Sequence, residues 1–267
     1  MPARQLIYLT VFGAAMRPLA EACVQSLRVA GRFDGDIWVF SDQPPLGAGA
    51  EHRPAEARTD WQEICAARID LGLTLPFEGY DAIAYVDADC LSTAPIAPLF
   101  GGMDALRAME DIKPMGTSQA ANGKLAEAER RRADCSSACA GVFAGAAGVL
   151  RAALPAWKAV YEQTPAGFFR DQHALNALIY RGLVPARLYP RSVVAPVNRE
   201  PDAYRQAPLL HFWSDSKPWM LPAWQRWQQR HRRGGPVRPD DEARRVSAMG
   251  LRHPIFTLSR YSGRGQG

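Results

Sequence analysis

The sequence predicts an α/β protein with a mostly parallel central sheet, and three observations carry that prediction. The 267 residues are 47% hydrophobic and 22% charged, which is typical of a folded globular chain. Strand-like and helix-like segments alternate through the first half, a pattern that gives right-handed crossovers between parallel strands. The third predicted strand then runs directly into Asp87-Ala88-Asp89, at the sheet edge where ligands bind in such folds.

The first predicted strand and helix come from the hydrophobic pattern. Residues 6–12 form an apolar run typical of a buried strand. Pro18 suits the first turn of the helix that follows, which carries one apolar stripe and ends near Gly31. Residues 36–40 are the second predicted strand. The Pro- and Gly-containing segment 44–58 is predicted to be a loop.

A second helix is expected before the third strand. Thr59 and Gln62 have the spacing of a capping box, which predicts that the helix begins there. The helix carries Arg68 and stops before Pro76. Residues 83–86 form the third predicted strand.

The second half is less regular. Residues 111–137 read as a polar excursion, and residues 139–150 as a core strand. Residues 170–181 predict a helix, residues 209–213 a short strand, and a Trp-rich basic helix is expected after Trp219. The only boundary that composition supports lies near residue 220, giving a domain over residues 1–220 and an extension over 221–267.

The charge is unevenly distributed. The net charge is +5, yet residues 221–267 contain ten Arg and three acidic residues, a balance of +7 that leaves −2 for residues 1–220. A body without basic excess argues against a nucleic-acid-binding protein. Trp and Arg side chains in the extension suit peripheral contact with a membrane surface, and they equally suit packing of the extension onto the domain.

Five cysteines, an odd number in a chain of ordinary size, favour free thiols and a reducing compartment. There is no apolar run of 18 residues, so no membrane-spanning helix is expected. Residues 6–16 are apolar enough to imitate a signal peptide, but Gly13 breaks this run and Arg17 and Pro18 end it. A first strand is therefore the preferred interpretation. We therefore expect a cytoplasmic protein, and the membrane-contact alternative for the extension would place it at the inner face of the membrane.

The strongest local signal for chemistry is the pair Asp87 and Asp89. Two carboxylates at a strand end offer the hard oxygen ligands that Mg²⁺ and Mn²⁺ prefer. A metal held there could bridge a diphosphate and help it to leave. Asp-X-Asp alone is a weak motif, because Asp is common in loops where it bonds to nearby backbone N–H groups.

Three further segments add candidates, each with a structural alternative. Asp171 and Gln172 open a predicted helix, where Asp171 could serve only as a cap. His211 could complete a carboxylate metal site and Lys217 could hold a phosphate, or they could be a core histidine and a surface lysine. Arg68 could face a phosphate or a sugar, or lie on a solvated helix face.

The order of these segments resembles family 8 glycosyltransferases, and within them the bacterial lipopolysaccharide sugar transferases. Over residues 5–220 the chain presents Arg68, Tyr-Val-Asp-Ala-Asp, Ala-Gly-Val, Asp-Gln-X-X-Leu-Asn and His-X6-Pro-Trp in that order. The resemblance implies a GT-A fold, with a mostly parallel sheet flanked by helices. It implies a hexosyltransferase of polysaccharide or lipopolysaccharide biosynthesis that uses Mn²⁺ or Mg²⁺, a nucleotide sugar such as a UDP-sugar, and retention at the anomeric carbon. It implies a glycan or lipid-linked acceptor.

The resemblance also implies residue roles. Asp87, Asp89 and His211 match the metal ligands, and Gln172 and Asp171 match the pair beside the donor sugar. The residues expected to contact the nucleotide-sugar donor, two of them also metal ligands, are Thr10, Arg68, Asp87, Ala88, Asp89, Ser214 and Lys217.

Three positions depart from the family pattern. Cys139 stands where the family often has Asn, and Ser214 where it usually has Gly. The first strand leads into no acidic residue, so Thr10 is the candidate for contact with the base. Base and sugar identity are left open by these changes.

For the reaction, we favour attack from the leaving-group face, because Gln172 is an amide and a poor nucleophile, with Asp171 as the alternative nucleophile. Two other functions stay open: a catalytically degenerate domain that binds nucleotide or glycan as a scaffold, and a sugar-nucleotidyltransferase. The second would need a Gly-rich basic loop after the first strand, which residues 12–17 match poorly.

Overall fold

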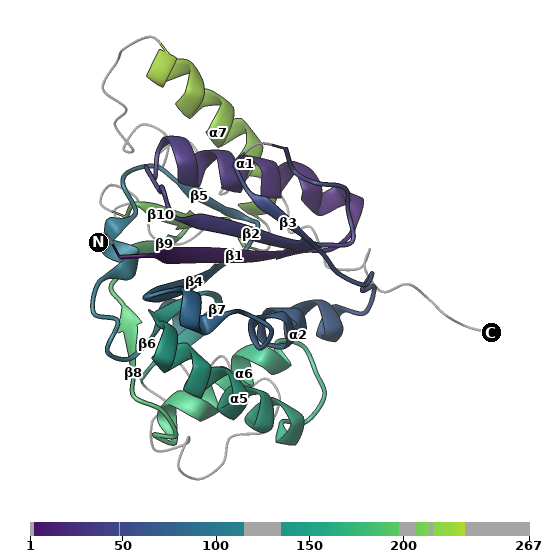
Figure 1. The fold of residues 1–267 in the computed structure, drawn as a ribbon, viewed down its shortest axis with the longest axis vertical. Coiled ribbons are helices and arrows are strands. Elements are labelled where there is room, and N and C mark those ends of the chain that lie inside the picture. Colours follow the sequence, from purple (N-terminus) through teal and green to yellow (C-terminus); the bar gives the residue numbers. More distant parts are fainter. Residues whose placement is uncertain (1–2, 48, 115–134, 198–206, 214–215, 233–267) are drawn as a thin grey trace, which may run out of the picture.

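A computed structural model of the chain describes residues 3–47, 49–114, 135–197, 207–213 and 216–232. In these residues a seven-stranded sheet lies between two layers of helices, and a three-stranded sheet stands at its side (Figure 1). The predicted α/β class with a mostly parallel central sheet is confirmed.

The central sheet has the order β3-β2-β1-β4-β7-β6-β8. Its strands are β1 (Gln5–Val11), β2 (Asp36–Ser41), β3 (Glu51–Pro54), β4 (Ala82–Val86), β6 (Leu106–Pro114), β7 (Ser136–Ala146) and β8 (Ala186–Tyr189). Every neighbouring pair is parallel except the two that β7 makes, with β4 and with β6. The first three predicted strands are therefore confirmed as β1, β2 and β4.

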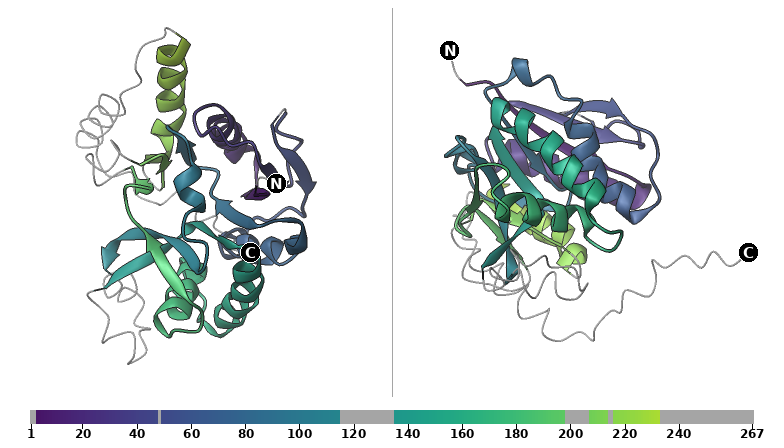
Figure 2. Two further views of the ribbon diagram at one scale, coloured as in Figure 1. Left: turned by 60° about the vertical axis from the view of Figure 1, so that its left-hand side comes forward. Right: turned by 90° about the horizontal axis from the view of Figure 1, so that it is seen from below.

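Helices cover both faces of the sheet, as both views in Figure 2 show. They are α1 (Arg17–Val29), α2 (Trp61–Gly72), α5 (Ala147–Gln163), α6 (Arg170–Tyr180) and α7 (Lys217–Arg232), with 3₁₀ turns η1 (Ala14–Met16), η2 (Phe77–Gly79) and η3 (Ala97–Phe100). Alternate β1 side chains enter two cores: Ile7 and Leu9 lie with α1 and α7, Leu6 and Tyr8 with α2, α5 and α6.

The small sheet has the order β5-β10-β9 and consists of β5 (Cys90–Ser92), β10 (Leu209–His211) and β9 (Val194–Pro196). β10 pairs antiparallel with β5 and parallel with β9. Because β5 follows directly on Asp89, this pairing brings His211 next to the Asp-X-Asp segment, 122 residues away in sequence.

Two predictions around α2 were wrong. The expected loop 44–58 contains β3, which pairs parallel with β2 through its backbone and is too exposed to show a hydrophobic pattern. The expected cap Thr59 is replaced by Asp60, whose side chain accepts hydrogen bonds from the backbone N–H groups of Gln62 and Glu63. A carboxylate at this position satisfies two otherwise unpaired donors and so fixes the start of α2.

The expected core strand 139–150 has different limits. β7 begins at Ser136 and ends at Ala146, and α5 starts with the next residue. Small apolar residues fit a strand and a helix equally well, so the sequence does not mark this junction. Of the expected polar excursion over residues 111–137, residues 115–134 lie outside the described residues. The start of the excursion belongs to β6 and its end to β7.

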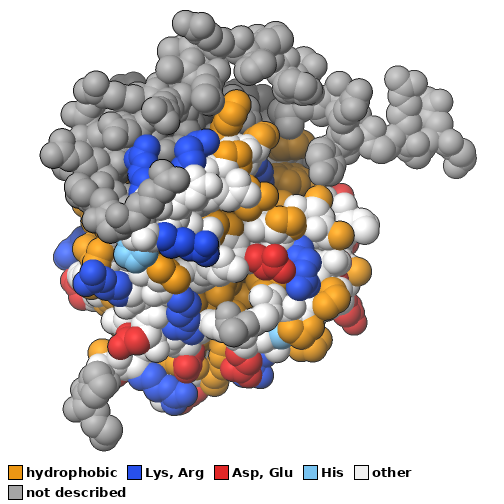
Figure 3. All heavy atoms as spheres, turned by 90° about the horizontal axis from the view of Figure 1, so that it is seen from above, with side chains coloured by type: hydrophobic (Ala, Val, Ile, Leu, Met, Phe, Trp, Pro, Cys, Tyr) orange, Lys and Arg blue, Asp and Glu red, His pale blue; other side chains and the backbone are white. Residues whose placement is uncertain are grey.

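The expected boundary at residue 220 falls within α7. Met220 and Trp224 are buried, and the Trp224 indole N–H donates to the Gln25 side chain of α1 at 3.3 Å. Trp227 stacks between Trp224 and His231. Seen from the α7 side, the described Lys and Arg side chains are interspersed with hydrophobic and acidic ones (Figure 3).

Among the described residues, no helix combines the length and the apolar character needed to cross a membrane. Membrane contact through the extension stays a prediction.

Candidate functional site

The Asp-X-Asp segment lies where the chain changes direction across the sheet. From β1 the chain proceeds to β2 and β3 on one side, then returns as β4 on the other side of β1. Crevices outside the carboxyl ends of the strands at such a switch point are the usual ligand sites of open α/β sheets. Asp87 follows β4 directly, and its backbone N–H donates to the carbonyl of Gly141 at 2.8 Å.

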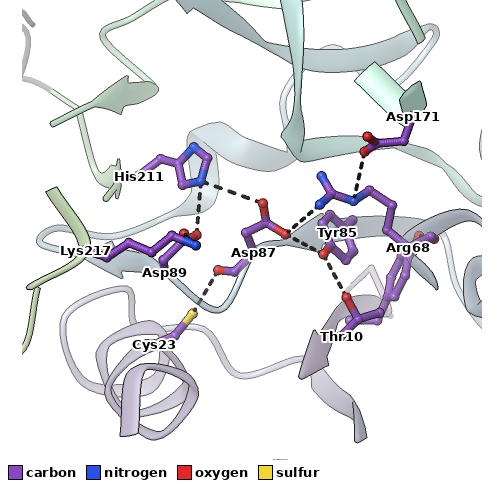
Figure 4. A network of polar contacts seen from close by, with 10 residues as sticks. Thr10, Cys23, Arg68, Tyr85, Asp87, Asp89, Asp171, His211 and Lys217 are labelled. Atoms are coloured by element: carbon purple, nitrogen blue, oxygen red, sulfur yellow. Dashed lines mark hydrogen bonds and ion pairs between the residues drawn. The ribbon is translucent and has the colours of Figure 1, made fainter. Parts of the chain in front are cut away.

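Asp87 stands at the centre of a polar network that Figure 4 shows. The Tyr85 hydroxyl donates to Asp87 Oδ1 at 2.5 Å and shares a second hydrogen bond of 3.0 Å with the Thr10 hydroxyl. The guanidinium of Arg68, on α2, lies 3.4 Å from the same Asp87 oxygen. Thr10 and Arg68, both predicted to contact the donor, are thus assembled around the first metal candidate.

Arg68 also contacts Asp171 of α6, with 3.5 Å between Nε and Oδ2. The Asp171 side chain is buried, and the Arg68 side chain is 11% exposed. Burial raises the pKa of Asp171 and outweighs the opposing effect of Arg68. Burial would lower the pKa of Arg68, but Asp87, Tyr85 and Asp171 together raise it well above its usual value.

Asp171 does not act as the cap that was its structural alternative. Phe169 holds the N-cap position of α6, in a left-handed conformation with φ 56°. The Asp171 backbone carbonyl accepts from the Trp157 indole N–H at 2.9 Å, which fixes this end of the helix against α5. The Asp171 side chain is therefore directed at Arg68 by the docking of α6.

Asp89 forms the second centre. Its Oδ1 lies 3.1 Å from His211 Nε2, and its Oδ2 lies 2.9 Å from Lys217 Nζ at the start of α7. Burial opposes ionisation, yet His211 and Lys217 outweigh it and hold the pKa of Asp89 well below its usual range. Burial would also lower the pKa of His211, but Asp89 raises it to about 10, and Asp89 likewise raises the pKa of Lys217.

His211 connects the two centres, because its Nε2 is also 3.7 Å from Asp87 Oδ2. Gly141 makes this convergence sterically feasible. A Cβ atom at this position would lie 2.5 Å from His211 Cε1 and 2.8 Å from Asp87 Oδ2. The glycine of the Ala-Gly-Val segment therefore leaves the space in which the carboxylates and the imidazole meet.

The donor set fits a divalent cation. Two carboxylates and an imidazole converge from β4, the segment after it and β10, and such oxygen and nitrogen donors suit Mn²⁺ or Mg²⁺. Cys90 lies near Asp89 and His211 as well. Burial raises the pKa of the Cys90 thiol well above its usual value, so in the metal-free protein this group is a neutral thiol.

The remaining predicted residues lie away from this convergence or outside the described chain. The Gln172 side chain donates to Asp111 Oδ2 on β6 at 3.0 Å, and no described contact joins it to the carboxylate pair. The Ala88 side chain is buried in the core beside α1, which leaves only its backbone for a ligand. Ser214 lies outside the described residues.

Sequence reasoning missed three contributors. Tyr85 links Thr10 to Asp87, Gly141 provides space, and Asp111 holds Gln172. Tyr85 and Gly141 were inside the motifs that carry the resemblance, so their position was a usable signal. Asp111 offered none, because its contact depends on how β6 and α6 come together.

No protein-family model matches the chain, and no curated protein shows significant sequence similarity to it. A function for this chain is therefore inferred from the residues and the geometry of the site.

Proposed function

We propose that the protein is a metal-dependent retaining glycosyltransferase that moves a hexose from a nucleotide sugar, in the first instance a UDP-sugar, to a hydroxyl of a glycan or lipid-linked acceptor. One observation carries the proposal. Two carboxylates, an imidazole, an ammonium and a guanidinium converge at the switch point of a mostly parallel sheet, in the sequence order that resembles family 8 glycosyltransferases. The GT-A fold is part of this proposal.

The charges have a direct use in such a reaction. Asp87, Asp89 and His211 would hold Mn²⁺, which when bound neutralises charge on a diphosphate. Lys217 would exchange part of its contact with Asp89 for a phosphate oxygen, and so stabilise the negative charge that grows as the nucleotide leaves.

The geometry around Asp171 favours attack from the leaving-group face. Its carboxylate is buried and paired with Arg68, with 3.5 Å between Nε and Oδ2, and an ion pair of this kind makes it a weak nucleophile. In the proposed step the acceptor oxygen forms a bond to the anomeric carbon as the bond from that carbon to the diphosphate oxygen breaks. The acceptor proton passes to the leaving phosphate oxygen, so no protein base is consumed.

Calorimetric titration of UDP, with and without Mn²⁺, tests the donor site. We expect binding that requires Mn²⁺ in the wild type and is lost in Asp89→Asn. Asp104→Asn is the matched control, because Asp104 pairs with Arg187 on the surface and both side chains are more than half exposed. Absence of UDP binding with Mn²⁺ present would overturn the UDP assignment.

A screen of UDP-hexoses with the wild type separates enzyme from scaffold. Release of UDP that depends on Mn²⁺ and an added sugar acceptor, with the product in the donor's anomeric configuration, is the expected result. Tight binding of UDP-sugars without turnover on any acceptor tested would favour the scaffold alternative.

A further inference from the structure

A sulfur donor lies within 4.8 Å of Asp89 and His211 and has no part in the function proposed above. Cys90 begins β5 and is the direct cross-strand partner of His211 on β10. Ligand atoms of Asp89, Cys90 and His211 all lie within 4.8 Å of one another, and all three residues are buried. Antiparallel partners place their side chains on the same face, so this closeness follows from the strand register.

The imidazole itself is incompletely paired. His211 is 3% exposed, and its Nδ1 has no hydrogen-bond partner among the described residues. A buried ring nitrogen without a partner is uncommon, and an ion bound at this nitrogen would explain it. Since the hydrogen bond to Asp89 uses Nε2, His211 has a second nitrogen to offer.

A second thiol is close to the same group. The Cys139 side chain, on β7, is near the His211 ring. Cys139 lies two residues before Gly141, whose missing side chain leaves space beside the His211 ring. Cys139 therefore lies next to the imidazole but outside the group of three residues whose ligand atoms lie within 4.8 Å of one another.

We propose that this centre also binds a thiophilic divalent cation such as Zn²⁺ through Asp89, Cys90 and His211. Zn²⁺ favours four nitrogen, sulfur and oxygen ligands in a tetrahedral arrangement, whereas Mn²⁺ and Mg²⁺ favour oxygen. Each thiol that binds releases its proton to solvent and becomes a thiolate ligand. Since Asp89 and His211 belong to both donor sets, the thiophilic cation excludes Mn²⁺. This exclusion rests on the proposed function, whereas binding of the thiophilic cation itself does not.

Cadmium, which binds thiolates strongly and gives an ultraviolet charge-transfer absorbance, is the probe. The titration uses Cys135→Ser as background, because Cys135 is the exposed cysteine. We expect saturation at one cadmium per chain. In Cys90→Ser we expect cadmium affinity to fall by on the order of tenfold or more, because loss of a ligand should weaken binding at least as much as loss of a group that only hydrogen-bonds to a ligand. Cys65→Ser, a buried thiol outside the donor group, should leave affinity unchanged. No absorbance in the background protein, or equal affinity in Cys90→Ser, would overturn the inference.

X-ray absorption of the zinc-loaded background protein keeps the inference testable if Cys90→Ser does not fold. Sulfur scatterers at about 2.3 Å support it, and a shell of nitrogen and oxygen alone overturns it. UDP calorimetry with Mn²⁺ on the zinc-free background protein distinguishes the two proposals, because bound zinc would itself exclude Mn²⁺. Sulfur ligation without UDP binding leaves this inference standing and removes the proposed function, and UDP binding without sulfur ligation does the reverse.

Discussion

The two ends of the site are built differently. At one end Asp89 lies between two cations, His211 and Lys217, supplied by β10 and α7. At the other end one cation, Arg68, lies between two carboxylates, Asp87 and Asp171. The first end depends on the small sheet, the second on the central sheet and the helices below it.

This difference gives each end a distinct electrostatic character. With His211 protonated, the Asp89 end carries an excess of one positive charge, and the Arg68 end an excess of one negative charge. A diphosphate would be favoured at the first end, and a divalent cation would be favoured where Asp87 Oδ2 approaches His211 once the imidazole has released its proton. In the proposed function this asymmetry would orient a nucleotide diphosphate across the site.

Removing the single cation of the carboxylate-rich end should have the largest effect. In Arg68→Met, Asp87 and the buried Asp171 lose their counter-charge, and breaking a buried pair in this way costs about 3–5 kcal/mol. Urea denaturation of the metal-free protein measures the loss. The matched control is Arg187→Met, whose surface pair with Asp104 is worth roughly 0–1 kcal/mol. Equal losses in the two variants would mean that Arg68 holds no buried charge in place.

Raising the pH should weaken the cation-rich end specifically. The pKa of His211 is about 10 in the folded protein, whereas its ordinary value, taken for the unfolded chain, is 6.5. Between pH 6.5 and pH 10 the folded state therefore retains a proton that the unfolded chain has lost. The stabilisation is complete below pH 6.5 and declines as the pH rises toward 10, by on the order of a few kcal/mol in total.

Urea denaturation of the metal-free protein from pH 6.5 to about 7.5 measures this slope before unfolded thiols begin to titrate. We expect a steeper decline in the wild type than in His211→Asn. Parallel slopes in the two proteins would show that His211 is not protonated in the folded state.

Filling the space between the two ends should have a smaller effect on stability. The Cβ atom of Gly141→Ala would contact His211 and Asp87 at less than ordinary distances, and such overpacking costs about 1–3 kcal/mol. Gly148→Ala, in α5 with no atom within 4 Å of its Cβ, should instead stabilise by about 0.4–1 kcal/mol. Opposite signs in thermal unfolding support the steric role of Gly141, and a stabilised Gly141→Ala contradicts it.

The frame of the site was predictable because short-range patterns specify it. Apolar runs marked β1, β2 and β4, and the end of β4 placed Asp87 at the ligand-binding edge of a parallel sheet. β3 could not be found, since its exposed side chains follow no pattern and its backbone pairing with β2 defines it.

The partners of the charged residues were less accessible. Helical spacing placed Arg68 on a face of α2, but its pairing with Asp171 depends on α6, which comes about a hundred residues later. His211 was a candidate ligand only through its place in the motif order, while the register of β10 against β5 decides that it reaches Asp89. Such long-range register is the part of the site that local pattern does not encode.

The most direct test of the account is whether one cation joins the two ends. Electron paramagnetic resonance of free Mn²⁺ counts bound ions in the wild type, Asp87→Asn, Asp89→Asn and the surface control Asp104→Asn. We predict one Mn²⁺ per chain, affinity lower by on the order of tenfold or more in both site variants, and no change in the control. Wild-type affinity in Asp87→Asn alongside a loss in Asp89→Asn would contradict the claim, because the two ends would then share no ion.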